Sequence, residues 1–261
     1  RTNMFSNIKE LYRCRVLVIS LILKELKLRY QGSALGFFWT FLNPLLLMCV
    51  YTIVFSVFLR IGVENYAVFL FCGLLPWAWF STSVLEGADS ILRGGELITR
   101  VLFPPQVLPT VTVFTNLINF VLSLPILFLF FLLFKIKIAT SLIALPIVMI
   151  IQAIFTMGIV LMVSALNVHF RDLQHILGNL IIIWFFVTPI IYPSTSIPTS
   201  LKFIIYMNPM GSLIKSYQNI LFYGRFPNWV LLGVTLVFGF VVFFLGNLVF
   251  NKYREFFPEE V

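Results

Sequence analysis

Residues 101–134 read VLFPPQVLPTVTVFTNLINFVLSLPILFLFFLLF and contain no Asp, Glu, Lys or Arg. The same four residue types are missing from IATSLIALPIVMIIQAIFTMGIVLMVSALNVHF, residues 138–170. A helix needs about 20 consecutive apolar residues to cross a hydrocarbon layer ~30 Å thick. Since a charged side chain at the bilayer centre costs roughly 2.5–3.5 kcal/mol on insertion scales, both stretches are expected to cross a membrane.

The rest of the chain follows the same pattern. Of its 261 residues, 60% are hydrophobic and 11% are charged, whereas soluble domains have about 25% charged residues. Four more stretches lack all charged residues: 30–59, 65–85, 173–201 and 226–251. We therefore predict an all-α membrane protein with a single transmembrane domain over residues 1–261. The six membrane-spanning helices are expected at about 36–59, 66–85, 110–134, 140–166, 176–192 and 229–250.

Three segments outside the spans are expected to be helical. Residues 8–30 have an apolar stripe, including Ile19 and Leu23, opposite basic residues, which is typical of an amphipathic helix lying in the membrane interface. A solvated helix packed on a partner is the alternative. Residues 86–109 predict a helix that continues span two, a break at Gly94-Gly95, and a short helix near 96–102. Residues 193–228 are semi-apolar and predict short re-entrant helices.

The basic residues favour one orientation. With six spans, 12 of the 18 Lys and Arg residues fall on the side that holds both termini, so both termini are predicted to be cytoplasmic. The net charge of +8 does not indicate nucleic acid, because the basic residues flank apolar stretches and suit anionic lipid head groups better.

The residue types and motifs that the sequence lacks exclude several functions. No carboxylate lies between Glu96 and Asp172, and Glu64 is the only one expected on the outer face. Acid–base catalysis needs positioned carboxylates or similar groups, and ion-driven transport needs ionisable residues inside the membrane. No Gly-x-x-x-x-Gly-Lys-Ser/Thr motif is present, so any ATP site must lie in a separate chain. We predict no catalytic site and, because His169 and His175 fall on different helix faces, no metal site.

Six fragments in fixed order resemble the permease subunit of bacterial ABC exporters for cell-surface polysaccharides. O-antigen exporters of the Wzm type are the most similar, and capsule and teichoic-acid exporters share the pattern. The fragments are RYQGSALGFFWTFLNPLL (29–46), FLFCGLLPWAWFS (69–81), SILRGGELITRVLFPPQVLP (90–109), FRDLQHIL (170–177), TPIIYP (188–193) and NPMGSLIKSYQNILFYG (208–224).

The resemblance implies half of a transporter. Two copies would form a channel through the bacterial inner membrane, and two cytoplasmic ABC ATPase subunits would use ATP and Mg²⁺, while this chain binds no cofactor. The substrate implied is a polysaccharide linked to a lipid through pyrophosphate. The resemblance places the gate and coupling region at 86–105, with Arg93, Glu96 and Arg100, and a second coupling pair at Arg171 and Asp172.

The remaining candidates concern the substrate. Aromatic faces stack on sugar rings, and Trp39, Tyr51, Trp184 and Tyr192 lie in or beside spans one and five, which tend to line the channel in the resembled family. Packing or interface roles are the alternative for each of them. Arginine forks match phosphate oxygens, so Arg29, Arg93 and Arg100 are candidates for steering the pyrophosphate. Two other functions stay open for this sequence: a drug or lipid ABC exporter, and a membrane enzyme acting on lipid-linked sugars.

Overall fold

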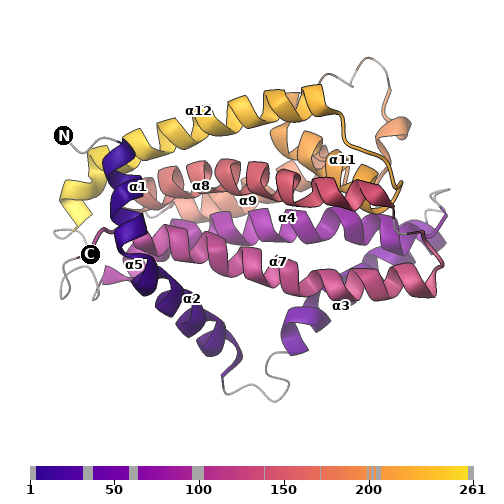
Figure 1. Cartoon of the computed structure of the whole chain (residues 1–261), viewed down its shortest axis with the longest axis horizontal. Coiled ribbons are helices and arrows are strands. Elements are labelled where there is room, and N and C mark those ends of the chain that lie inside the picture. Colours follow the sequence, from indigo (N-terminus) through magenta and orange to yellow (C-terminus); the bar gives the residue numbers. More distant parts are fainter. Residues whose placement is uncertain are drawn as a thin grey trace.

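The computed structural model describes residues 4–31, 38–58, 64–95, 103–137, 139–170, 172–198, 200, 203 and 207–257. These residues form helices joined by turns, with no β-strand among them (Figure 1). The prediction of an all-α protein is therefore confirmed. The principal helices are α1 (Met4–Arg13), α2 (Arg15–Tyr30), α3 (Trp39–Thr52), α4 (Tyr66–Ala88), α5 (Ser90–Arg93), α7 (Val107–Leu133), α8 (Leu145–His169), α9 (Leu173–Val187), α11 (Pro209–Leu221) and α12 (Trp229–Tyr253).

Four of the described helices are long and apolar enough to cross a membrane. They are α4, α7, α8 together with the 3₁₀ turn that precedes it, and α12, and they correspond to predicted spans two, three, four and six. Predicted span one falls on α3, which has 14 residues and continues as a π-helix over Ile53–Phe58. Predicted span five falls on α9, which has 15 residues and ends at Val187, before Thr188 and Pro189.

Helix α4 is the central element of the core. It packs against α7, α8, α11 and α3, and most of its side chains are buried. Phe80 stacks on Phe155 of α8, with ring centroids 5.8 Å apart. The amide Nε2 of Gln152 donates to the carbonyl of Pro76 over 2.8 Å, so a buried polar side chain of α8 bonds to the backbone of α4 at the helix proline.

Helices α8 and α12 cross closely because glycines lie at the contact. A Cβ atom added at Gly158 would come within 2.5 Å of the backbone nitrogen of Phe243, and one at Gly246 would overlap the carbonyl of Gly158. Small residues of this kind let the backbones of membrane helices approach each other. The opposite side of α12 exposes apolar side chains such as Val230 and Val237.

The N-terminal segment forms two helices, although the sequence predicted one over 8–30. α1 and α2 meet at Cys14, and α2 packs on α7 through a small apolar cluster that contains Ile22, Val107 and Val111. Ile19 and Leu23 of the predicted apolar stripe are exposed. The location of this stripe in the membrane interface stays a prediction.

The two connecting segments are partly described. Only Asp89 separates α4 from α5, and Gly94 follows α5. The short helix predicted near 96–102 lies outside the described residues. In the 193–228 segment, α11 is a short buried helix that packs on α4 and α12.

Candidate functional site

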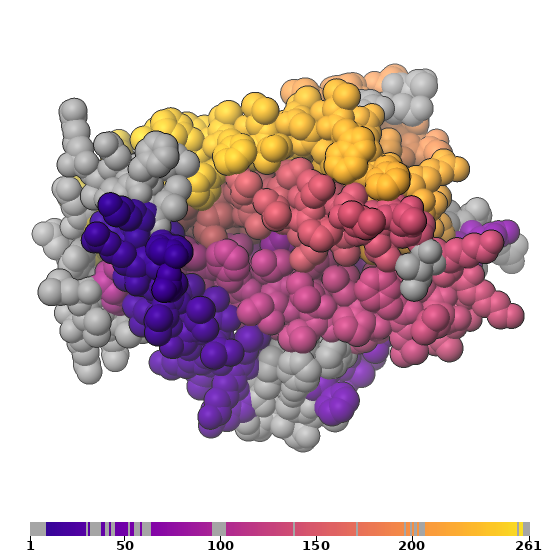
Figure 2. Space-filling model, viewed as in Figure 1, coloured from indigo at the N-terminus to yellow at the C-terminus, as the bar shows by residue number. Residues whose placement is uncertain are grey.

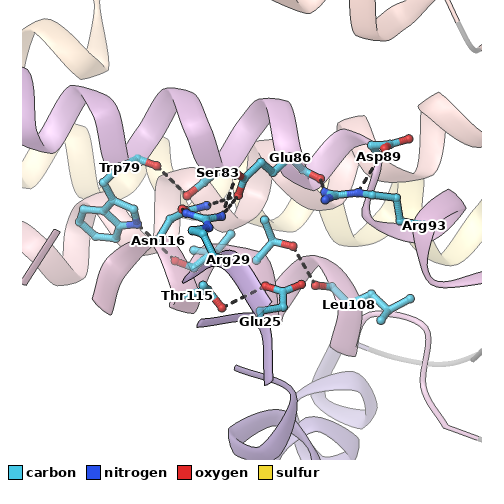
Figure 3. Close-up of polar contacts among 12 residues, drawn as sticks. Glu25, Arg29, Trp79, Ser83, Glu86, Asp89, Arg93, Leu108, Thr115 and Asn116 are labelled. Atoms are coloured by element: carbon cyan, nitrogen blue, oxygen red, sulfur yellow. Dashed lines mark hydrogen bonds and ion pairs between the residues drawn. The ribbon is translucent and has the colours of Figure 1, made fainter. Parts of the chain in front are cut away.

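Charged and polar side chains from α2, α4 and α7 meet where the apolar part of α4 ends. Glu86 is the first charged residue after the charge-free stretch 65–85, and it lies in the last turn of α4. Arg29 lies in the last turn of α2, and Asn116 lies within α7. We call Glu25, Arg29, Glu86, Thr115 and Asn116 the α2–α4–α7 junction (Figure 3).

The centre of the junction is a closed triangle of hydrogen bonds. Nη2 of Arg29 donates to both carboxylate oxygens of Glu86, over 2.8 and 2.7 Å. Nη1 of Arg29 donates to Oδ1 of Asn116 over 3.1 Å, and Nδ2 of Asn116 donates to Oε2 of Glu86 over 3.0 Å. The Arg29 and Glu86 side chains are each 32% exposed. Bonds between ionised partners are about twice as strong as neutral ones, so this triangle fixes three helices to one another.

Glu25 adds a second contact between α2 and α7. Oγ1 of Thr115 donates to its carboxylate Oε2 over 3.1 Å. Burial raises the pKa of Glu25 above its ordinary value, and this effect exceeds the opposing effects of the Thr115 hydrogen bond and the positive charge of Arg93. Burial acts in this direction because it disfavours the charged form of a carboxyl group.

The junction continues into α5. Nη2 of Arg93 donates to the backbone carbonyl of Glu86 over 2.6 Å, and its Nε lies 3.2 Å from the carboxylate of Asp89. The last turn of a helix leaves carbonyls without intrahelical partners, and Arg93 binds one of them. A displacement of α5 therefore acts on the same turn of α4 that carries Glu86.

Two of the predicted site arginines lie in this region. Arg29 and Arg93 were predicted to steer pyrophosphate, and the structure shows Arg29 bound to Glu86 and Arg93 bound to Asp89. Glu96, Arg100 and Arg171 lie outside the described residues. Asp172 precedes α9 and is exposed beside an open groove of about 710 Å³, which His169 and Leu173 also line. The coupling role of these residues stays a prediction.

The sequence named neither Glu25 nor Glu86 as a site residue, although Glu86 is the first residue of the predicted gate and coupling region 86–105. One signal was available for Glu25, which precedes Arg29 by four residues and so lies on the same face of α2. For Glu86, the available signal was its place at the end of a charge-free stretch. Neither signal identifies Arg29 as the partner of Glu86, since the two are 57 residues apart.

The four predicted channel aromatics do not form one group. Trp39 is exposed on α3, and Tyr51 stacks on Phe185 with centroids 6.0 Å apart. Nε1 of Trp184 donates to Oδ1 of Asn208 over 2.8 Å, and the Tyr192 hydroxyl donates to a backbone carbonyl of α9. Their role in lining a channel stays a prediction.

Acidic, His and Cys side chains do not gather into a metal site in the described ranges, where no group of three could hold an ion. The ring of His169 packs instead against Tyr253, with centroids 4.7 Å apart, and against Phe256.

Comparison with known proteins gives one consistent result. The family described as ABC-2 type transporter matches residues 16–222. The chain is similar to the O-antigen export system permease protein RfbA of Myxococcus xanthus, with 44% identity over 99% of this chain and 100% of that protein. It is 34% identical to an RfbA protein of Klebsiella pneumoniae over 93% and 94% of the two chains. Polysialic acid transport protein KpsM of Escherichia coli is 21% identical, over 92% of this chain and 95% of KpsM.

Proposed function

Because the chain belongs to the ABC-2 type transporter family, we propose that it is the transmembrane subunit of an ATP-driven exporter for lipid-linked O-antigen polysaccharide. The observation that carries this proposal is the 44% identity with an O-antigen export permease along the whole chain. The similarity to the polysialic acid transporter is much lower, at 21%, and this favours O-antigen over capsule. ATP and Mg²⁺ would be bound by a separate ATPase subunit, in keeping with the absence of a phosphate-binding loop in this sequence.

The proposed assembly contains two copies of this chain and two ATPase subunits in the inner membrane. Six spans per copy are proposed, with α3 and its π-helix and α9 crossing beside the four longer helices. Helix α1 packs on the end of α12, where Nη1 of Arg254 lies 3.5 Å from Oε2 of Glu10 (Figure 1). This arrangement supports an even number of crossings, and the excess of basic residues supports a cytoplasmic location for both termini.

The proposed mechanism uses the α2–α4–α7 junction as a mechanical link. ATP-driven motion of the partner would act on the segment 86–105 and on the loop around Asp172. Arg93 connects α5 to the last turn of α4, and the Arg29–Glu86 pair connects that turn to α2. The movement would then reach α7 through Asn116 and open a path for the polysaccharide between the two copies.

The steering of the pyrophosphate group is a separate part of the proposal. A free guanidinium binds phosphate oxygens through two parallel hydrogen bonds. Arg29 already directs both of its terminal nitrogens at Glu86 and Asn116. It would have to release Glu86 to bind pyrophosphate, and Arg93 would have to release Asp89 in the same way. Arg29, Arg93 and Arg100 all stay candidates for steering the pyrophosphate.

The test is complementation of a host that lacks its own O-antigen permease. Expression of this chain with its ATPase should restore surface O-antigen, detected on intact cells by antibody, and the ATPase should co-purify with it. Without the chain, polysaccharide should accumulate inside the cell. Unchanged surface O-antigen in the deletion host, or the absence of any ATPase partner in native membranes, would contradict the proposal.

The same host separates the two other functions. A drug or lipid exporter would restore efflux in cells that have no polysaccharide synthesis. A membrane enzyme would act without ATP, and Glu64→Gln would abolish its activity. Under the proposal, Glu64→Gln leaves export unchanged because Glu64 is exposed outside the helices.

A further inference from the structure

A cavity of about 230 Å³ lies between α7, α8 and α12, and α1 forms one of its walls. Figure 2 shows this face of the molecule, with α8 between α7 and α12 and α1 crossing the end of α8. The cavity is lined by Leu11, Gln106, Thr110, Val113, Phe114, Ala153, Ile154, Met157, Leu161, Phe243 and Asn247. It is separate from the α2–α4–α7 junction, none of whose residues line it.

The walls are suited to hydrocarbon. The middle of the cavity is formed by aliphatic, thioether and aromatic side chains, including Ala153, Met157 and Phe243. An apolar cavity of about 150 Å³ in a soluble protein stays dry and admits a benzene-sized molecule. The larger cavity here has room for a longer apolar group, such as a segment of a flexible chain.

The mouth of the cavity faces the region that lipid tails occupy. Phe114 lines the cavity and is partly exposed, and Ile150, one turn before Ala153 on α8, is 60% exposed. Phe240 and Phe244 of α12 are also exposed. Since α7, α8 and α12 all have spanning length, these apolar surfaces belong in the hydrocarbon layer, and the cavity opens among them.

The end of the cavity nearest α1 has a different character. Gln106, Thr110 and Asn247 bring polar groups to its lining. Three exposed basic residues lie around this end of the helices, namely Arg13 and Arg15 at the α1–α2 turn and Lys252 near the end of α12. Clusters of Lys and Arg beside a membrane helix attract anionic lipid head groups.

We propose that this cavity binds a segment of one acyl chain of an anionic phospholipid, whose head group lies against Arg13, Arg15 and Lys252. The ion pair between Glu10 and Arg254 holds α1 against the end of α12, and Leu11, the next residue of α1, covers the bound chain. The bound lipid thereby fills the space between α1 and the three spans. We choose a phospholipid tail over a polyisoprenyl carrier because an unbranched chain is thinner than one with repeated methyl branches.

The experiment uses the complete transporter, with its ATPase, in nanodiscs. The probe is phosphatidylglycerol with a photoactivatable diazirine in the middle of one acyl chain. After illumination, mass spectrometry locates the labelled residues. We expect labelling of Met157 and Phe243 in the cavity to exceed labelling of Val237, which lies exposed on α12. Equal labelling of cavity and exposed surface would overturn the proposal.

Two substitutions on α8 provide the matched comparison. Ala153→Trp fills the cavity and should remove most of the labelling of Met157 and Phe243, while the labelling of Val237 stays. Ile147→Trp adds the same side chain almost two turns away from Ala153, on the exposed surface of α8, and should leave all labelling unchanged. Cavity labelling that survives Ala153→Trp in a correctly assembled transporter would overturn the proposal.

Two further experiments test the head group and the type of lipid that supplies the acyl chain, without altering the cavity. Arg13→Gln combined with Arg15→Gln should remove the preference for the phosphatidylglycerol probe over a phosphatidylcholine probe, and this variant keeps the test valid if Ala153→Trp fails to assemble. An unchanged preference would refute the head-group assignment. If an equal amount of polyisoprenyl phosphate displaces the probe, the occupant of the cavity is the lipid carrier, and the phospholipid assignment is wrong.

Discussion

The substitution Glu86→Gln tests the α2–α4–α7 junction most directly. It keeps the size of the side chain, removes its charge and turns one acceptor oxygen into a donor that faces Arg29. Both oxygens of Glu86 accept hydrogen bonds from Arg29, and Asn116 supplies a third. The variant therefore leaves the guanidinium with one acceptor oxygen at position 86 in place of two and brings an N–H₂ group against it.

The size of the effect follows from the exposure of the pair. Breaking a buried ion pair costs about 3–5 kcal/mol, whereas an exposed pair contributes roughly 0–1 kcal/mol. Arg29 and Glu86 are each 32% exposed, so they lie between these limits. We expect Glu86→Gln to lower the free energy of unfolding by about 1–3 kcal/mol, with the lower half of this range favoured by solvent screening.

The assay is a double-mutant cycle measured by unfolding in mixed detergent micelles. Arg29→Gln, Glu86→Gln and the double variant are compared with the wild-type chain, and the expected coupling energy is about 1 kcal/mol or more. The pair Arg93–Asp89 serves as the internal control, because its side chains are 55% and 28% exposed and lie on neighbouring turns. A pair of that kind contributes about 0.3–0.5 kcal/mol.

The double-mutant cycle has two possible results, which lead to opposite conclusions about the junction. A coupling energy for Arg29 and Glu86 that clearly exceeds that of the control pair supports a junction that holds α2 against α4. A coupling energy near zero, or equal to that of Arg93 and Asp89, would show that the Arg29–Glu86 pair does not hold α2 against α4. In that case the charged contacts could not serve as a mechanical link.

Two further substitutions test the packing and the buried carboxyl group. Gly246→Ala should destabilise the protein by about 1–3 kcal/mol, because the added methyl group overlaps the carbonyl of Gly158; Gly233→Ala on the same helix meets nothing within 4 Å and should leave the melting temperature unchanged or raised. Burial raises the pKa of Glu25 above its ordinary value of 4.5, so the stability that depends on its protonated form is present below pH 4.5 and is lost as pH rises through the higher folded-state pKa. Glu25→Gln should therefore raise the melting temperature near neutral pH and flatten its dependence on pH above 4.5; an unchanged difference between the two proteins across this range would contradict the assignment.

The sequence predicted the long helices well because the signal for a membrane span lies within one continuous segment. The absence of charge over 138–170 already specifies a helix of spanning length, and the described structure has one over Thr140–His169. The sequence predicted the ends of the helices less accurately. Span five was expected over 176–192, but α9 runs from Leu173 to Val187, since a helix boundary depends on local backbone geometry that composition does not specify.

The junction could not be predicted in the same way. Its bonds join Arg29 to residues 57 and 87 positions later in the chain, and no local spacing relates them. Pairing across such distances depends on how α2 lies on α7. That arrangement depends in part on the apolar cluster that contains Ile22, Val107 and Val111, and the sequence of α2 offers several equally apolar faces for it.

In the proposed mechanism, the location of the junction would allow a few charged residues to be enough for coupling. Apolar helix faces pack without strong directional preference, so α2 could slide along α7 at little cost if only Ile22 and its neighbours held it. A guanidinium bound to two carboxylate oxygens has one favourable geometry, and it fixes the register of α2 against α4. A pair of this strength is expensive inside the hydrocarbon layer. It is therefore best placed at the end of the charge-free part of α4, where Glu86 and Arg29 meet, and where movement of a cytoplasmic partner would first reach the spans.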